Sequence, residues 1–147
     1  MDSKEHDKKI SYSELEIGTI VSKQSYLLDR ESVQKYILAV EDSTNSIVAE
    51  SSNIAPPMSI AALSLRGVVN DLNIPGGTLH IGQELSFLKT VPVGMYLECE
   101  AVLSSNSVRG DFRFMVVDLS VRDDVKDHVM KGKSTIMLPV DLSLIHI

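Results

Sequence analysis

The 147-residue chain has one cysteine, Cys99, no tryptophan and only 5% aromatic residues. A single cysteine cannot form a disulfide within the chain, so a reducing compartment is the default expectation. Few aromatics, scattered Lys and Arg and a net charge of −6 argue against a surface that binds nucleic acid. The four histidines are dispersed, and together with one cysteine they predict no metal site.

Long hydrophobic runs are also missing. No apolar stretch approaches the roughly 20 residues that a membrane-spanning helix needs. The charged N-terminal stretch MDSKEHDKKI lacks the apolar segment of a secretory signal. These absences predict a cytoplasmic protein without a membrane partner. The length and the 44% hydrophobic content are those of one globular domain with a sizeable core.

We expect this single domain to span residues 14–140, after a polar and disordered N-terminal segment, residues 1–13. The final LSLIHI matches, in order, the translation of a common transposase sequencing adapter. Residues 141–147 are therefore expected to be an artefact, with the natural chain continuing past that point. A genuine short apolar tail is the alternative.

Two helices are predicted in the first half of the chain. Residues 29–43 form the first, with Asp29 as its N-cap and apolar residues at i, i+3, i+4 and i+7. Residues 55–72 form the second, with Pro56 and Pro57 in the first turn, where a missing N–H costs little. Few of its residues are charged, so we expect most of this helix to be buried.

The remaining segments are predicted to be strands separated by turns. They cover residues 15–28, 78–89, 95–105, 111–121 and 128–140. The alternation of apolar and polar residues in 111–121 is typical of a half-buried antiparallel strand. This order predicts an α+β hot-dog fold, an antiparallel sheet wrapped around a long central helix. A ferredoxin-like fold is the alternative, but it needs a helix between the later strands.

Three stretches carry a resemblance to a known family: IAPPM at residues 54–58, LHIGQELSF at 79–87 and VPVG at 91–94. With these, the chain from about Leu15 to Pro139 resembles the MaoC-like hot-dog dehydratases. The closest likeness is to their N-terminal-half type, called FAS1-like dehydratase domains. The resemblance implies a thioester of CoA or acyl carrier protein as ligand, addition or removal of water at a 2-enoyl/3-hydroxyacyl bond, and no cofactor.

Active members of that family carry a motif like Asp-x-Asn-Pro-Ile-His after the first helix, whose Asp and His move protons during hydration. The matching stretch here is STNSIV, which places Ser43 at the Asp and Val48 at the His. Asp42 could be the acid only if the loop has gained a residue, and valine cannot transfer a proton. We therefore predict no catalytic residue in this chain.

The resemblance thus implies the non-catalytic or substrate-binding half of a 3-hydroxyacyl-thioester dehydratase or enoyl-CoA hydratase. The family works as two hot-dog units. The second unit here would be another copy in a homodimer, a catalytic partner subunit or a missing C-terminal half.

The predicted substrate-binding residues lie at the N-terminus of the second helix and in the strand that follows it. They are Ala55, Pro56, Pro57, Met58, Ala61, Ala62, His80 and Gln83. Unpaired N–H groups at a helix N-terminus are suited to hold a thioester oxygen, and small side chains leave room for an acyl chain. For His80, a structural role within the sheet is the alternative.

Two other functions stay open. One is a stand-alone acyl-CoA thioesterase, with Glu84 or Asp71 as its base. The other is a non-enzymatic acyl-CoA-binding module. Lys131 and Lys133 could meet CoA phosphates, although an exposed strand face is the commoner meaning of such lysines.

Asp123 and His128, in the stretch DDVKDH, have the spacing of the family's catalytic pair. Their position in a hairpin between two late strands instead predicts a solvated turn. Cys99 alternates with apolar residues and is expected to lie in the core without a chemical role.

Overall fold

The computed structural model describes residues 11–40 and 53–140. These residues form one five-stranded antiparallel sheet, two α-helices and a short 3-10 helix. In chain order the elements are the 3-10 helix (Tyr12–Glu14), β1 (Ile20–Leu27), α1 (Arg30–Val40), α3 (Pro57–Asp71), β2 (Leu79–Phe87), β3 (Tyr96–Arg109), β4 (Phe112–Arg122) and β5 (His128–Pro139).

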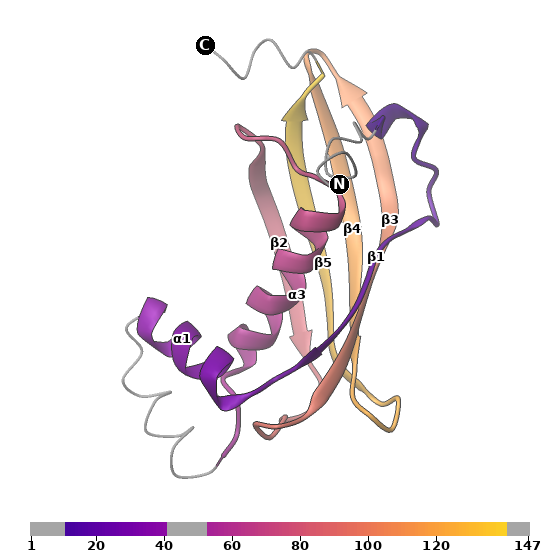
Figure 1. Ribbon diagram of the computed structural model, residues 1–147. Coiled ribbons are helices and arrows are strands. Elements are labelled where there is room, and N and C mark those ends of the chain that lie inside the picture. Colours follow the sequence, from indigo (N-terminus) through magenta and orange to yellow (C-terminus); the bar gives the residue numbers. More distant parts are fainter. Residues whose placement is uncertain (1–10, 41–52, 141–147) are drawn as a thin grey trace, which may run out of the picture.

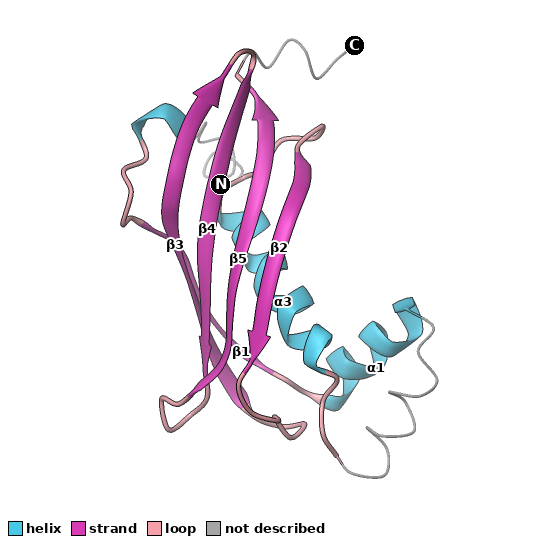
Figure 2. Ribbon diagram, turned by 180° about the vertical axis from the view of Figure 1, so that it is seen from behind, coloured by secondary structure: helices cyan, strands magenta, loops and turns pink. Residues whose placement is uncertain are grey.

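The strands follow one another in the sheet as β1-β3-β4-β5-β2, so β1 and β2 are its two edges. They form one curved layer, and α3 runs along one face of it (Figure 1). Seen from behind, the other face carries no helix in the described part of the chain (Figure 2). No helix separates the strands from β2 to β5. The predicted α+β hot-dog fold is therefore confirmed, and the ferredoxin-like alternative is wrong.

The helix α1 begins where the sequence predicts. The carboxylate of Asp29 accepts a hydrogen bond from the backbone N–H of Ser32 at 2.7 Å, and this bond lowers the pKa of Asp29. Val33 and Ile37, one turn apart, are buried on the same side of the helix. The predicted end at residue 43 lies outside the described residues.

The second helix, α3, starts with the predicted prolines: Pro56 is the N-cap and Pro57 the first residue. Its buried residues form one face, namely Ser59, Ile60, Ala61, Ser64, Gly67 and Val68. Met58 and Val69 on the other side are 45% and 49% exposed. The expectation that most of the helix is buried was wrong for a single chain, because one sheet covers only one side of a helix.

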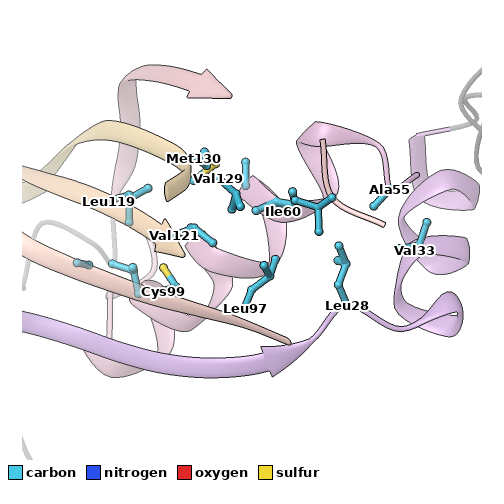
Figure 3. Close-up of a cluster of buried hydrophobic side chains, with 14 of the residues drawn as sticks. Leu28, Val33, Ala55, Ile60, Leu97, Cys99, Leu119, Val121, Val129 and Met130 are labelled. Carbon is cyan, nitrogen blue, oxygen red and sulfur yellow. The ribbon is translucent and has the colours of Figure 1, made fainter. Parts of the chain in front are cut away.

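The core fills the space between α3 and the sheet. Alternate residues of β4 are buried, as predicted for residues 111–121. The same alternation along β3 buries Leu97 and Cys99, which join Leu119 and Val121 in one cluster (Figure 3). The core position of Cys99 is confirmed, and burial raises the pKa of its thiol. Complete burial of a leucine stabilises the fold by about 1.5–3 kcal/mol.

Several boundaries differ from the expectation, and strand β1 begins at Ile20 rather than at residue 15. Tyr12, placed by its sequence in a disordered segment, begins the 3-10 helix, and its hydroxyl lies 2.9 Å from the carbonyl oxygens of both Leu72 and Asn73. Strand β3 continues beyond residue 105 because the β3–β4 pairing runs to Arg109 opposite Phe112. The limits of the domain as a whole stay a prediction.

Within residues 11–40 and 53–140, neither α-helix combines the length and the apolar character needed to cross a membrane.

Candidate functional site

The N-terminus of α3 is held by a short pairing with the loop after β2. The N–H of Ala55 donates to the carbonyl of Val91 at 2.9 Å, and the N–H of Val93 donates to the carbonyl of Asn53 at 2.8 Å. No side chain caps the helix here, and its N-cap and first residue are prolines without an N–H. Met58 therefore carries the first backbone donor of α3.

Two pockets flank this helix end. One, of about 200 Å³, lies between the first turn of α3 and the loop after β2, with Ala55, Pro57 and Lys89 in its wall. The other, of about 310 Å³, lies between α1 and α3, where Ala62 and Arg66 contribute to the lining. Ser59 also lines the second pocket, but its hydroxyl donates to the carbonyl of Pro56 at 2.6 Å.

A third pocket, of about 180 Å³, lies at the opposite end of α3. It is lined by the second half of α3 and by residues of β2, β4 and β5, and His80 is part of its wall. No hydrogen bond joins the His80 ring to another residue within the described ranges, and the expected structural role of His80 in the sheet stays a prediction.

The predicted substrate-binding residues are thus divided among separate places. Ala55 and Pro57 line one pocket, Ala62 lines another and His80 a third. The remaining members differ in exposure: Pro56 and Ala61 are buried, whereas Met58 and Gln83 are exposed. Whether these residues bind a substrate stays a prediction, but the single chain does not gather them around one cavity.

The stretch STNSIV, with Ser43 and Val48 at the positions of the catalytic pair, lies outside the described residues. Its assignment therefore rests on the sequence. The two histidines within the described ranges are His80 and His128, and neither forms an ion pair with a carboxylate there. The Nδ1 atom of His128 lies 3.2 Å from the hydroxyl of Ser120, and burial lowers its pKa.

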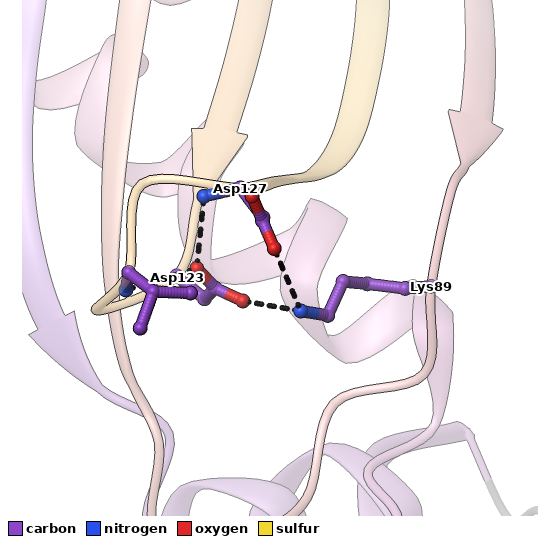
Figure 4. Close-up of polar contacts among 4 residues, drawn as sticks. Lys89, Asp123 and Asp127 are labelled. Atoms are coloured by element: carbon purple, nitrogen blue, oxygen red, sulfur yellow. Dashed lines mark hydrogen bonds and ion pairs between the residues drawn. The ribbon is translucent and has the colours of Figure 1, made fainter.

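The turn between β4 and β5 is solvated over residues 124–127, as expected, but Asp123 at its start is not. Its side chain is only 2% exposed, because the β4–β5 hairpin folds over it. The backbone N–H groups of Val125 and Asp127 donate to its carboxylate at 3.1 and 3.0 Å, and Lys89 donates at 2.5 Å (Figure 4). The bond from Lys89 lowers the pKa of Asp123. These contacts make Asp123 a structural clamp between two loops and leave it without a bond to His128.

The residues proposed for a thioesterase occupy unsuitable positions. Glu84 stands opposite Lys133 in the β2–β5 register, and its neighbour Leu85 packs on the core. Successive strand residues point to opposite faces, so Glu84 lies on the face away from α3. Asp71, at the end of α3, accepts hydrogen bonds from Ser22 at 2.7 Å and from Gln24 at 3.2 Å. Glu84 is thus on the opposite face of the sheet from the first turn of α3, and Asp71 is at the other end of that helix.

Lys131 and Lys133 are exposed on the strand face that carries Glu84. This is the exposed strand face that the sequence offered as the alternative to a site for CoA phosphates. Sequence reasoning missed Thr78 and Ser134, which line the same pocket as His80. The sequence did offer one signal: Ser134 occupies a core-facing position of its strand, and the neighbouring residues on that face are apolar.

Comparison with known proteins places the fold. No protein-family model and no curated protein matches the sequence. Among solved structures, the unliganded R-hydratase PhaJ1 from Pseudomonas aeruginosa is similar over 88% of this chain and 86% of its own, with a TM-score of 0.72 and 22% identity. The truncated HadBC (3R-hydroxyacyl-ACP dehydratase) complex from Mycobacterium tuberculosis matches over 84% and 98%, with a TM-score of 0.67 and 19% identity.

A mutant of the fluoroacetyl-CoA-specific thioesterase FlK is also similar, over 86% of this chain and 90% of its own, with a TM-score of 0.63 and 18% identity. The structural neighbours therefore include R-hydratases, MaoC-like dehydratases and a thioesterase, all built on the hot-dog fold. At these identities the likeness establishes the fold of the chain.

Proposed function

We propose that the chain is the substrate-binding, non-catalytic half of a 3-hydroxyacyl-thioester dehydratase or enoyl-CoA hydratase. A second hot-dog unit would supply the Asp and His that activate water and protonate the substrate. The observation that carries this proposal is a fold like that of R-hydratases in a chain whose described histidines, His80 and His128, pair with no carboxylate.

An open sheet edge supports the pairing with a second unit. Strand β2 bonds to β5 on one side, and on its other side no strand from residues 11–40 or 53–140 pairs with it. Leu79 and Ile81 of β2, with Leu88 just after it, are about half exposed. Unpaired strand edges with apolar side chains are the usual place where another strand adds. The HadBC neighbour is a complex of two proteins by its name, which fits such an arrangement.

The thioester would lie beside the first half of α3. The pocket of about 310 Å³ between α1 and α3 has Lys35 and Arg66 in its wall, and their positive charges suit the phosphates of CoA. The uncapped N-terminus of α3 would then offer the N–H of Met58 to the thioester oxygen.

Binding of crotonyl-CoA to the purified chain, measured by calorimetry, tests this proposal. Ala62 is exposed in the α1–α3 pocket, so Ala62→Trp should fill that space and weaken binding at least about tenfold. Asn70→Trp, at an exposed position near the other end of α3, is the matched control and should leave the affinity unchanged. Equal affinity in both folded variants would contradict this location of the thioester.

The same experiment separates the alternatives. Ala61→Trp is unsuitable for it, because Ala61 is fully buried and a larger side chain would overpack the core. Release of free CoA by the isolated chain, lost in Glu84→Gln or Asp71→Asn, would favour the thioesterase. Binding without turnover, in a chain that accepts no second hot-dog unit, would favour the non-enzymatic binding module.

A further inference from the structure

A groove of about 340 Å³ crosses the sheet on the face away from α3, which is the face turned to the viewer in Figure 2. Its walls come from β1, β3 and β4 and from the β4–β5 hairpin. Alternate residues of β3 and β4 pack in the core, so the side chains between them, Glu100 and Ser120 among these, face the groove. The groove and the thioester site proposed beside α3 therefore lie on opposite sides of the sheet.

The charged side chains of this groove are unevenly paired. The Nζ atom of Lys126 donates to both carboxylate oxygens of Glu98, at 2.7 and 2.8 Å. Arg122 stands opposite Glu98 in the β3–β4 register, and Lys23 stands opposite Glu100 in the β1–β3 register. In the described part of the chain, neither Arg122 nor Lys23 forms an ion pair. Lys126 thus occupies the carboxylate that faces Arg122 across the strands.

Strand β5 adds two basic side chains beside the groove. His128 stands opposite Arg122, and Lys131 stands opposite Ser120 in the β4–β5 register. The Nδ1 atom of His128 lies 3.2 Å from the Ser120 hydroxyl. Burial, and after it the charges of Lys131 and Arg122, lower the pKa of His128 and outweigh the opposing charge of Asp127. Positive charge therefore predominates around this imidazole.

The excess of positive charge suits a phosphate group. Four lysine or arginine side chains and two glutamates lie in or beside the groove, namely Lys23, Lys126, Arg122, Lys131, Glu98 and Glu100. Two positive charges are therefore left uncompensated, which matches the charge of about −1.5 to −2 that a phosphate monoester carries at pH 7. The planar guanidinium of Arg122 can donate two parallel hydrogen bonds to phosphate oxygens.

The remainder of the ligand should carry hydroxyl groups. The carboxylate of Glu100 forms no hydrogen bond to a side chain within residues 11–40 and 53–140, and a carboxylate only accepts hydrogen bonds. No aromatic side chain from these residues lines the groove, so it offers no surface on which a ring could stack. Its volume lies at the lower end of the range for small-molecule sites.

We propose that this groove binds a small phosphorylated compound with hydroxyl groups, such as a polyol phosphate, with the phosphate on Arg122 and a hydroxyl on Glu100. Ser120 and Lys23, which line the same groove, add donors for the phosphate. This site does not depend on the proposed dehydratase role, because it lies on the other face of the sheet.

Titration of the full chain with glycerol 3-phosphate tests the proposal. Binding is followed by NMR through the amide signals of Glu100 and Ser120, at low ionic strength because salt screens exposed charges. Glycerol 3-phosphate should bind about three- to tenfold more tightly than inorganic phosphate, as expected for one net hydrogen bond from a hydroxyl. D-glycerate, which has a carboxylate in place of the phosphate, should bind more weakly than glycerol 3-phosphate.

Arg122→Gln should weaken the binding of glycerol 3-phosphate at least about tenfold, because it removes a charged hydrogen-bond donor. Lys133→Gln is the matched control. Lys133 is exposed on the same face but stands between Asp118 and Glu84 in the strand registers, outside the groove, so its loss should leave the affinity unchanged. Circular dichroism checks that both variants are folded.

Two further readouts accompany these titrations. Bound phosphate should raise the pKa of His128, measured from its ring protons, because it offsets the charges of Arg122 and Lys131. Arg122→Gln should leave the binding of crotonyl-CoA unchanged, and a parallel loss of both ligands would overturn the separation of the two sites. Absence of saturable binding, equal weakening by Arg122→Gln and Lys133→Gln, or tighter binding of D-glycerate than of glycerol 3-phosphate would overturn the phosphate site itself.

Discussion

Replacing Ile81 by Asp should prevent the pairing of this chain through the edge of its sheet. Ile81 stands in β2 between two residues of the β2–β5 register, His80 and Gly82, at an irregularity of the pairing. Its side chain is 49% exposed. Because no strand in the described part of the chain pairs with the opposite side of β2, a second hot-dog unit added there would cover this side chain.

The expected loss follows from this exposure. Complete burial of an isoleucine contributes about 1.5–3 kcal/mol, and half of that surface is already covered in the single chain. Association would therefore gain about 0.8–1.5 kcal/mol from each Ile81, or roughly twice that in a symmetric dimer. An aspartate at this position would not provide this gain, and its carboxylate would also have to lose its bound water when the interface forms. We expect the dissociation constant to rise at least about tenfold, since 1.4 kcal/mol corresponds to a factor of ten.

Light scattering and sedimentation across a concentration series measure this effect. The wild-type chain is expected to dimerise. Val108→Asp is the matched control, because Val108 is 48% exposed but lies in β3, away from β2. A strictly monomeric wild-type chain, or equal weakening by Ile81→Asp and Val108→Asp, would refute the reasoning about this edge.

Two further predictions concern stability. Leu97→Ala removes a fully buried side chain of β3 and should lower the free energy of unfolding by about 2–5 kcal/mol. Leu38→Ala, at a position that is 74% exposed, should change it by less than about 0.5 kcal/mol. Denaturant unfolding measures both values, and similar losses would contradict the burial of Leu97 in the core. The hydrogen bond from Lys89 holds the pKa of Asp123 in the folded protein below its ordinary value of 3.8. This interaction therefore stabilises the fold in full above pH 3.8. The stabilisation is lost as the pH falls through the lower pKa that Asp123 has in the folded protein. Asp123→Asn should therefore make the free energy of unfolding fall less steeply below pH 3.8 than it does in the wild type. The same pH dependence in both proteins would argue against a stabilising Lys89–Asp123 interaction.

The fold could be predicted from the sequence because local patterns suffice for it. Alternation in residues 111–121 gave the correct inward face of β4, and Asp29 and Pro57 marked the correct helix starts. Asp123 shows the limit of such patterns. Its partner Lys89 is 34 residues away in the chain, and no local signal indicates that the loop after β2 meets the β4–β5 hairpin.

The candidate site was harder to predict, since neighbouring residues of a helix point in different directions. Ala61 and Ala62 are adjacent in the sequence, yet Ala61 packs in the core and Ala62 faces the pocket beside α1. Helical geometry turns each residue by about 100° from the last, so consecutive residues cannot line one tunnel wall. Helical geometry alone could therefore have shown that Ala61 and Ala62 do not face the same pocket.

Hydration of crotonyl-CoA by the isolated, purified chain is the most direct test of whether this chain lacks the catalytic pair. We expect the chain to bind the thioester and to show no hydration above the uncatalysed rate, since loss of a general acid–base group alone costs about 10²–10⁴ in rate. Addition of a hot-dog protein that carries the Asp and His should restore turnover. Robust hydration by the isolated chain, abolished by His80→Ala, would contradict the non-catalytic role and identify His80 as a catalytic residue.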